Sequence, residues 1–408
     1  MKEFAKNHYK HIIYLDFHEN KELRTIFTGS LEVDYLTMLI SAAIKDAIFV
    51  ANETCIIFDE IQECPQARAS LKYFKLDGRY DIICTGSLLG VNGYSSKNTD
   101  DEMASVPVGF EQIVEMYPMD FEEWLWANDI TKPVFDFLNK SYRNETPVPE
   151  ALHNRMRQLL NEYLIVGGMP EVVKTFMETH NLNQTLTLQR NIVDEYKMDM
   201  IKYANSEDRA KIRECFESIP RQLSRDNKKF TYSVVKKGGR SKDYISSLQW
   251  IEDAGIVRKC YNLSITGLPL SGNAMPDCFK VYMADTGLFI SMLDDGTQFD
   301  ILQGRLDSYK GAIYENIMAD ILGKMGRKLY YFQKNDSLEI DFVIRLNGEC
   351  VPIECKARTG NAKSLKTLLN HPEKYHVTHA VKCGDYNVGR QDNVLTIPFY
   401  MAFMLSDM

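Results

Sequence analysis

Two neighbouring acidic residues, Asp59 and Glu60, stand where the apolar run CIIF ends. Such a run predicts a buried strand of a parallel sheet, and the carboxyl ends of those strands face the ligand crevice. An aspartate there can hold a Mg²⁺ ion on the phosphates of a nucleotide, and the adjacent glutamate can orient an attacking water. The alternative is that the acidic pair simply begins a solvated loop.

A second apolar run, YDIIC, ends in hydroxyl-bearing residues and favours the nucleotide interpretation. It is followed by Thr85, Gly86 and Ser87. If the two strands are neighbours, a hydroxyl at the end of the second strand can sense the terminal phosphate. We therefore take Asp59 and Glu60, with Thr85 or Ser87, as a candidate nucleotide site.

Near the C-terminus, three residues on two predicted strands could share another site. In VPIECKA, the alternation of a strand puts Glu354 and Lys356 on one face. The preceding segment EIDFVIR carries Asp341, and an Asn-Gly pair between the two segments predicts a tight hairpin. Pairing the two strands places Asp341 near Glu354.

The upstream segment GAIYENIMADILGKM adds a third carboxylate. It predicts an amphipathic helix, with three isoleucines at helical spacing on one face and Glu315 off that face. The carboxylates of Glu315, Asp341 and Glu354 could hold Mg²⁺ or Mn²⁺. Lys356 could then deprotonate or position a water for phosphodiester hydrolysis. The alternatives are surface decoration and a nuclease-like domain that only binds DNA.

Residues 225–242 form a basic segment between two predicted helices. They hold seven Lys or Arg against one acid, Asp226, a net charge of +6. Such a patch suits contacts with the DNA backbone, and the flanking helical pattern fits a winged helix. The alternative is a solvated loop on a domain used for packing. The candidate contacts are Lys236, Lys237, Arg240 and Lys242.

Composition limits the class of protein that can carry these sites. At about 150 residues per domain, 408 residues predict two or three domains. With 45% apolar and 25% charged residues and a net charge of −8, the chain is typical of a soluble globular protein, so nucleic-acid contact requires a local basic patch. Nine cysteines without a CxxC pair indicate free thiols in a reducing cytoplasm, and the histidines form no zinc motif. The most apolar region, residues 36–58, is too interrupted for a membrane helix.

The pattern of apolar runs divides the chain into three parts. Strand-like runs alternate with helical patterns at first, the middle is mostly helical, and strands return towards the C-terminus. Polar stretches predict a linker at 139–150 and a loop at 268–278. The predicted strands are 12–17, 55–60, 80–86, 112–117, 329–333, 339–345 and 349–357.

The motifs together resemble a known family. IIFDEIQECPQARASLKYF followed by YDIICTGSLL is similar to the Walker B and sensor-1 segments of a prokaryotic AAA-type P-loop ATPase family, and further matches follow in order, among them EMYPMDFEEWL, YLIVGGMPEVV and VYMADTGLF. The resemblance implies ATP with Mg²⁺ as cofactors, Asp59 as the magnesium ligand, Glu60 as the water-orienting residue, and Ser87 or Thr85 as the sensor.

The chain departs from that family in one respect. The phosphate loop GxxxxGK[ST], expected before the strand at 12–17, is absent from the sequence. The resemblance implies that a strand, the loop and most of a helix are missing, the strand lying between those at 80–86 and 112–117. We expect poor ATP binding and favour truncation over natural loss. An Arg-bearing family segment is also replaced, by ASVPVGFEQ, which puts arginine-finger chemistry in doubt.

The C-terminal constellation resembles the PD-(D/E)XK nuclease superfamily, with Glu315, Asp341, Glu354 and Lys356 at its helix Glu, Asp and ExK positions. The predicted fold is therefore α/β: an incomplete parallel-sheet P-loop ATPase-like domain at 1–138, a helical and winged-helix-like region at 150–270, and a restriction-endonuclease-like domain at 275–408. The leading hypothesis is a cytoplasmic, nucleic-acid-linked ATPase with DNA as partner; self-association or a protein partner stays open. The alternatives are a non-catalytic DNA-binding or regulatory protein with vestigial sites, and an ATP-independent metal-dependent nuclease.

Overall fold

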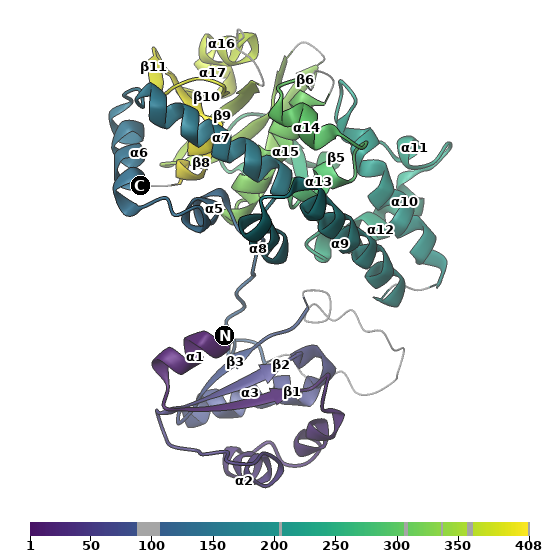
Figure 1. Ribbon diagram of the computed structural model, residues 1–408. Helices are drawn as coiled ribbons and strands as arrows, with labels where there is room; N and C mark the ends of the chain where they lie inside the picture. The colour runs from purple at the N-terminus through teal and green to yellow at the C-terminus, as the bar shows by residue number, and fades with distance from the viewer. Residues whose placement is uncertain (88–106, 204–205, 306–308, 336–337, 357–361, 407–408) are drawn as a thin grey trace. The chain divides into compact units, whose positions relative to one another are not determined.

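A computed structural model describes residues 1–87, 107–203, 206–305, 309–335, 338–356 and 362–406. Contacts divide the chain into two compact units, Met1–Met116 and Tyr117–Met408, and each is described separately. The fold is mixed α/β, as predicted, with a parallel sheet in the N-terminal unit and helical and sheet-rich parts in the C-terminal unit (Figure 1). Within the described residues, no helix combines the length and apolar character needed to span a bilayer.

Three parallel strands form the centre of the N-terminal unit. They are β1 (His11–Asp16), β2 (Thr54–Asp59) and β3 (Asp81–Cys84), in that order across the sheet. The first three predicted strands are thereby confirmed. The apolar run in β2 is buried throughout because it lies in the middle of the sheet with helices on both faces.

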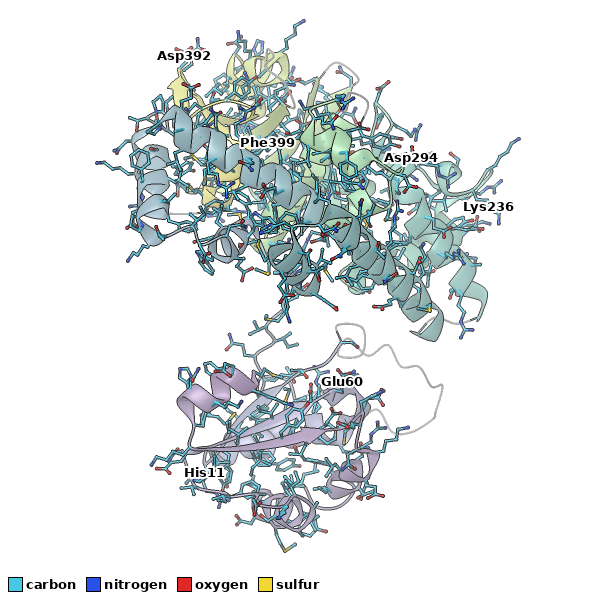
Figure 2. All side chains as sticks on the ribbon, viewed as in Figure 1. His11, Glu60, Lys236, Asp294, Asp392 and Phe399 are labelled. Carbon is cyan, nitrogen blue, oxygen red and sulfur yellow. The ribbon has the colours of Figure 1, made fainter. Side chains whose placement is uncertain are left out.

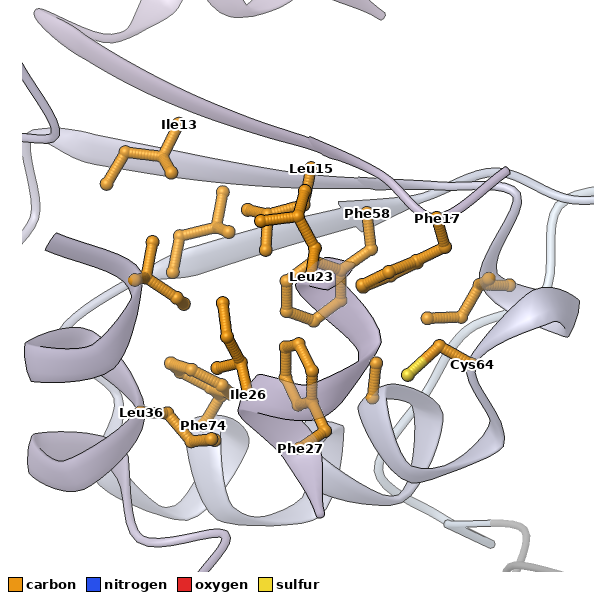
Figure 3. Packing of buried hydrophobic residues seen from close by; sticks show 14 of the residues in the cluster. Ile13, Leu15, Phe17, Leu23, Ile26, Phe27, Leu36, Phe58, Cys64 and Phe74 are labelled. Atoms are coloured by element: carbon orange, nitrogen blue, oxygen red, sulfur yellow. The ribbon is translucent and has the colours of Figure 1, made fainter. Parts of the chain in front are cut away.

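The two faces of β2 pack against different helices. Ile56 and Phe58 face the larger core, where Phe58 meets the rings of Phe17, Phe27 and Phe74 (Figure 3). The helices that cover this core are α2 (Val33–Ala43), α3 (Pro65–Asp77) and the 3₁₀ turn η1 (Lys21–Phe27). The opposite face of β2 packs against Ala5 of α1 (Lys2–His8). This alternation follows from the two-residue period of a strand.

The predicted strand at 112–117 is wrong. These residues all lie in the described part and form no strand, so β3 is an edge of the sheet there. An apolar run becomes a strand only when a neighbouring strand takes up its backbone hydrogen bonds, and the described residues supply no such neighbour. The segment is instead held by Glu111, whose carboxylate binds Arg68 of α3 in a bidentate ion pair at 2.6 and 3.1 Å. Ile113, Val114 and Met116 are exposed.

The C-terminal unit begins with helices and continues with two sheets. The helices are α5 (Phe121–Ala127), α6 (Lys132–Asn144), α7 (Glu150–Val166), α8 (Pro170–Thr179), α9 (Leu182–Tyr203), α10 (Ser206–Leu223), α11 (Tyr232–Val235), α12 (Ser241–Asp253), α13 (Thr286–Ser291), α14 (Thr297–Leu302), α15 (Lys310–Lys324), α16 (Lys363–Leu369) and α17 (Pro372–Tyr375). The 3₁₀ turns η3 (Leu270–Asn273) and η4 (Phe399–Met404) lie among them.

One sheet has the strand order β5-β4-β6-β7 and the other β11-β12-β10-β9-β8. Helix α15 contacts strands of both sheets and is buried all round rather than amphipathic, which corrects the prediction for that segment. The strands are β4 (Val257–Leu263), β5 (Ala274–Met283), β6 (Leu329–Asn335), β7 (Leu338–Ile340), β8 (Phe342–Leu346), β9 (Glu349–Lys356), β10 (Ala380–Gly384), β11 (Gly389–Gln391) and β12 (Val394–Pro398).

Three further predictions meet different outcomes. The hairpin at Asn347–Gly348 is confirmed: β8 and β9 pair antiparallel, and both turn residues have positive φ, as a two-residue hairpin turn requires. The linker at 139–150 is wrong in part, because α6 runs to Asn144 and buries Phe135, Leu138 and Tyr142. The loop at 268–278 is also wrong in part, because β5 begins at Ala274 and pairs with β4.

Candidate functional site

In the N-terminal unit, the ends of β2 and β3 bring Asp59 and Thr85 into contact. The hydroxyl of Thr85 donates a hydrogen bond to one carboxylate oxygen of Asp59, and the hydroxyl of Tyr14, on β1, donates to the other. The ammonium of Lys2 lies 3.5 Å from the centre of the Tyr14 ring. Three parallel strands thus contribute to one polar site at their carboxyl edge.

The hydrogen bonds keep Asp59 ionised. Burial would raise the pKa of Asp59, but the hydrogen bonds from Thr85 and Tyr14 outweigh it, so the pKa lies below its ordinary value. The same bond to Asp59 raises the pKa of Tyr14, which therefore keeps its proton and remains a donor. The site presents an ionised carboxylate whose position is held by two hydroxyl groups. Carboxylate oxygens are the ligands that a hard cation such as Mg²⁺ binds.

Glu60 directly follows Asp59 in the chain, and Ser87 follows Thr85 by two residues. Glu60 has a φ of 54°, in the left-handed region, and its carboxylate accepts a hydrogen bond of 2.5 Å from the Gln62 side chain (Glu60 is labelled in Figure 2). Its backbone N–H lies 3.4 Å from the hydroxyl oxygen of Thr85. Ser87 is half-buried. Thr85, one of the two predicted sensor residues, contacts Asp59.

In the C-terminal unit, the hairpin and α15 bring the four predicted residues together. The backbone N–H of Cys355 donates to the carboxylate of Asp341 at 2.8 Å, which fixes Asp341 against β9. Lys356 contacts Glu354 at 2.5 Å. Glu315 approaches from α15, and burial together with the charge of Glu315 raises the pKa of Asp341. We call Glu315, Glu339, Asp341 and Glu354 the carboxylate cluster.

Two lysines that the sequence did not single out complete this cluster. Lys280, on β5, is fully buried and contacts Glu339 at 2.7 Å and Glu315 at 3.5 Å. Lys228, in the loop after α10, contacts Glu315 at 2.9 Å with a side chain only 16% exposed. A Lys in a basic stretch, such as Lys228, and a single Lys in an otherwise apolar run, such as Lys280, carry no sequence signal for burial, so only the tertiary structure reveals them.

The lysines divide the carboxylates into ionised and protonated groups. Burial raises the pKa of Glu315, but Lys280 and Lys228 outweigh it and lower the pKa to about 2. Burial together with the charges of Glu315 and Glu354 raises the pKa of Asp341 well above its ordinary value. Burial also raises the pKa of Glu354, against the effect of Lys356. The raised pKa values of Asp341 and Glu354 therefore favour one shared proton on this pair of carboxylates.

The donor set does not match a metal site. Across the described residues, no group of three or more His, Cys, Asp or Glu side chains is placed to hold a metal ion. Each oxygen of Glu315 already has a lysine within 3.5 Å. The predicted metal ligands of the C-terminal unit are thus close together, but ammonium groups stand among them.

The basic segment, residues 225–242, follows α10, includes α11 and ends in the first turn of α12. The β4–β5 hairpin comes after α12 in the chain. Lys237, Arg240 and Lys242 are exposed. Lys236 projects from the surface (Figure 2) and contacts Glu214 at 3.0 Å. The predicted cationic surface is therefore present, although Lys236 is partly neutralised.

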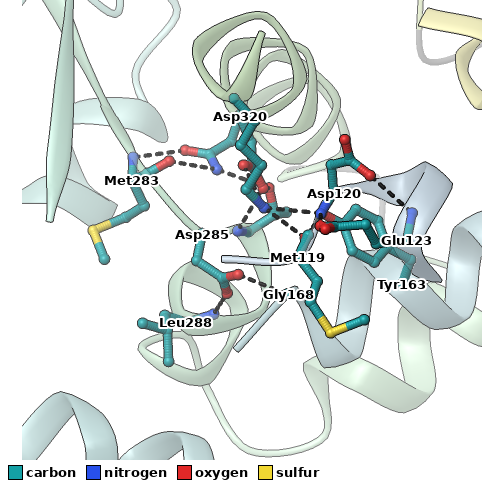
Figure 4. Close-up of polar contacts among 12 residues, drawn as sticks. Met119, Asp120, Glu123, Tyr163, Gly168, Met283, Asp285, Leu288 and Asp320 are labelled. Carbon is teal, nitrogen blue, oxygen red and sulfur yellow. Dashed lines mark hydrogen bonds and ion pairs between the residues drawn. The ribbon is translucent and has the colours of Figure 1, made fainter. Parts of the chain in front are cut away.

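A buried polar network joins segments that lie far apart in the sequence (Figure 4). The carboxylate of Asp285 accepts hydrogen bonds from the backbone N–H of Gly168 at 2.7 Å and of Leu288 at 2.9 Å. The carbonyl of Met119 accepts hydrogen bonds from the side-chain ammonium of Lys324 at 3.0 Å and from the hydroxyl of Tyr163 at 2.7 Å. We call these contacts the Asp285 latch; it is structural, since its groups bind one another.

Comparisons with known proteins bear on the class of the N-terminal unit. Residues 1–125 match a family model described as an AAA domain. Residues 157–298 and 310–401 match two domains of unknown function, DUF8612 and DUF4143. A solved structure titled a Walker-type ATPase of Pyrococcus abyssi is similar at 13% identity and a TM-score of 0.38, over 69% of this chain and 84% of that one. No curated protein matches the chain. The first part of the chain is thus similar to AAA-type ATPase domains, as the motifs predicted.

Proposed function

We propose that the protein is an ATPase-like, nucleotide-responsive protein whose N-terminal unit holds Mg²⁺-nucleotide at the carboxyl edge of its sheet. Asp59 would hold the Mg²⁺ ion, Thr85 would respond to the terminal phosphate through its bond to Asp59, and Glu60 would orient water. The observation that carries the proposal is the ionised Asp59 fixed by hydroxyls from two neighbouring strands. The match of residues 1–125 to an AAA domain supports it.

Binding should be weak and should depend on Asp59. Because the sequence has no GxxxxGK[ST] loop, backbone N–H groups and a lysine for the β- and γ-phosphates are missing, and we expect a Kd on the order of 1 mM. Asp59→Asn should weaken Mg²⁺-dependent ATP binding at least about tenfold, since it removes the charge that holds the cation. Titration calorimetry with and without Mg²⁺ measures this.

Two further variants make the test specific. Asp81→Asn is the matched control, because Asp81 is a carboxylate at the opposite end of β3, where it binds Tyr9 at 2.8 Å. It should leave the affinity for ATP unchanged, and so should Glu60→Gln, which removes the charge of that side chain but keeps its size. Equal affinity of Asp59→Asn and the unchanged protein, or binding that ignores Mg²⁺, would refute the proposal.

We further propose DNA binding by the C-terminal unit as a second function. The exposed Lys237, Arg240 and Lys242, next to a helix and an antiparallel hairpin in the order of a winged helix, favour it. Hydrolysis of DNA is not part of the proposal, because lysines neutralise the carboxylates that would have to hold the metal ion.

Replacing Lys237, Arg240 and Lys242 together by glutamine should weaken DNA binding and reduce the salt slope of log K by up to about 2.7, because each phosphate contact contributes about 0.9. Fluorescence anisotropy with a duplex oligonucleotide at several salt concentrations measures both. The matched control replaces three exposed cations on α6, Lys132, Lys140 and Arg143. If both triple variants lose affinity equally, attraction is non-specific and the proposed surface is wrong.

A further inference from the structure

The ammonium group of Lys280 lies inside the carboxylate cluster, where no solvent reaches it. It contacts Glu339 at 2.7 Å and Glu315 at 3.5 Å, and it lies 4.9 Å from the centre of the Tyr331 ring. A buried ammonium is retained only where carboxylates and aromatic faces replace its hydration. Lys280 therefore sits where the negative charges of the cluster converge.

Lys228 approaches Glu315 from the other side. Its ammonium contacts one carboxylate oxygen of Glu315 at 2.9 Å, while Lys280 and the hydroxyl of Tyr282, at 2.9 Å, contact the other. Both oxygens of Glu315 are thus engaged by groups of this chain. A metal ion could use Glu315 only by displacing a lysine.

The other carboxylates of the cluster also have partners within the chain, so little negative charge is left for an added cation to neutralise. Asp341 accepts from the backbone at Cys355, and one oxygen of Glu354 contacts Lys356. The second oxygen of Glu354 is buried and has no hydrogen-bond partner among the described residues. Three lysines therefore face four carboxylates, and a divalent cation added to them would be repelled by the ammonium groups.

We infer that Lys280, assisted by Lys228, is a built-in counter-cation that takes the place of a divalent metal ion in the carboxylate cluster, so that the C-terminal unit folds and is stable without metal. The inference is independent of nucleotide binding by the N-terminal unit. It also explains why a lysine of the basic segment turns inwards: Lys228 ties that segment to α15.

Mn²⁺ is the probe that tests this. All proteins carry Asp59→Asn, so that any cation at the N-terminal site is removed from the measurement. The protein with Lys280 intact should bind no Mn²⁺ at millimolar concentration by electron paramagnetic resonance, and its thermal midpoint should be the same in Mn²⁺ and in EDTA. Lys280→Ala should lower the midpoint in EDTA by about 10 °C, since it leaves buried carboxylates uncompensated. It should also gain one Mn²⁺ site that returns at least half of that loss.

The matched control is Lys259→Ala. Lys259 is also buried and contacts Glu252 at 2.8 Å, but it lies outside the carboxylate cluster, so its loss should lower the midpoint without creating a Mn²⁺ site. If Lys280→Ala does not fold, the same measurements are made on Lys228→Ala, with the same expected loss in EDTA and the same gain of a Mn²⁺ site. Mn²⁺ binding to the protein with both lysines present, lost on Glu354→Gln, overturns the inference. So does a folded lysine variant that gains no Mn²⁺ site.

Discussion

Gly168→Ala is expected to unfold the C-terminal unit. A Cβ atom at this position would lie 1.9 Å from the carbonyl oxygen of Met119, which is backbone and not a side chain that can turn away. The backbone of Gly168 is held on both sides, because its N–H donates to Asp285 and its carbonyl accepts from the N–H of Met119, each at 2.7 Å. Relief of the clash must break this pairing and leave the buried Asp285 without the hydrogen bond from Gly168 to one of its carboxylate oxygens. We expect a loss above about 4 kcal/mol in the free energy of unfolding.

Urea unfolding followed by tryptophan fluorescence measures this loss, because the three tryptophans, Trp124, Trp126 and Trp250, all belong to the C-terminal unit. Gly311→Ala is the matched control. Gly311 is a helical glycine of α15 with open space around its Cβ position, so alanine should change stability by less than about 1 kcal/mol, in the stabilising direction. Similar urea midpoints for Gly168→Ala and the unchanged protein would contradict the prediction, because they would show that the Asp285 latch can accommodate the added methyl group without loss of stability.

Phe58→Ala is expected to destabilise the N-terminal unit by about 3–5 kcal/mol. The ring is fully buried and meets three other rings, those of Phe17, Phe27 and Phe74, at centroid distances of 5.5 to 6.4 Å. Helices on one side and the sheet on the other prevent the space from closing, so the variant loses both the transfer energy and the packing of the ring. A loss of this size is a large fraction of the stability of a unit of about 116 residues.

Hydrogen exchange measured by mass spectrometry resolves this effect, because peptides from β1, β2 and β3 report on the N-terminal unit alone. Their protection should fall, while the fluorescence transition of the tryptophans should not move. Leu76→Ala serves as control, since that leucine of α3 is 67% exposed and its loss should matter by less than about 0.5 kcal/mol. If Phe58→Ala and Leu76→Ala lose protection equally, the ring does not organise the core.

The sequence predicted what local pattern controls. The continuous apolar runs of β1 to β3 predicted strands that are buried on both faces. The polar residues directly after β2 and β3 predicted that Asp59 and Thr85 would meet at one edge of the sheet. Asp341 and Glu354 meet because the Asn347–Gly348 turn sets the register of β8 on β9. In each case the decisive information lies within one strand or one turn.

The predictions that failed depend on contacts between segments that are remote in sequence. Residues 112–117 have the composition of a strand but no neighbouring strand in the described part, and pairing is not a property of the segment itself. Lys280 sits in AMPDCFKVYM, where a lone lysine indicates a solvated position. It is buried because β5 packs against α15, an element remote in sequence that brings Glu315. Charge compensation across the fold cannot be read from spacing.

The Asp285 latch also has a consequence for the order of events during synthesis. Its contact between Met119 and Lys324 spans 205 residues, whereas the pairing of β1, β2 and β3 joins residues that all lie within the first 116. At about 5–20 residues per second, a ribosome needs roughly 10–40 s to extend the chain from one end of the latch to the other. The N-terminal sheet can therefore close while α5, α7 and α8 still wait for the strand and helix that complete them, and through that interval a nascent chain exposes the apolar faces that chaperones bind.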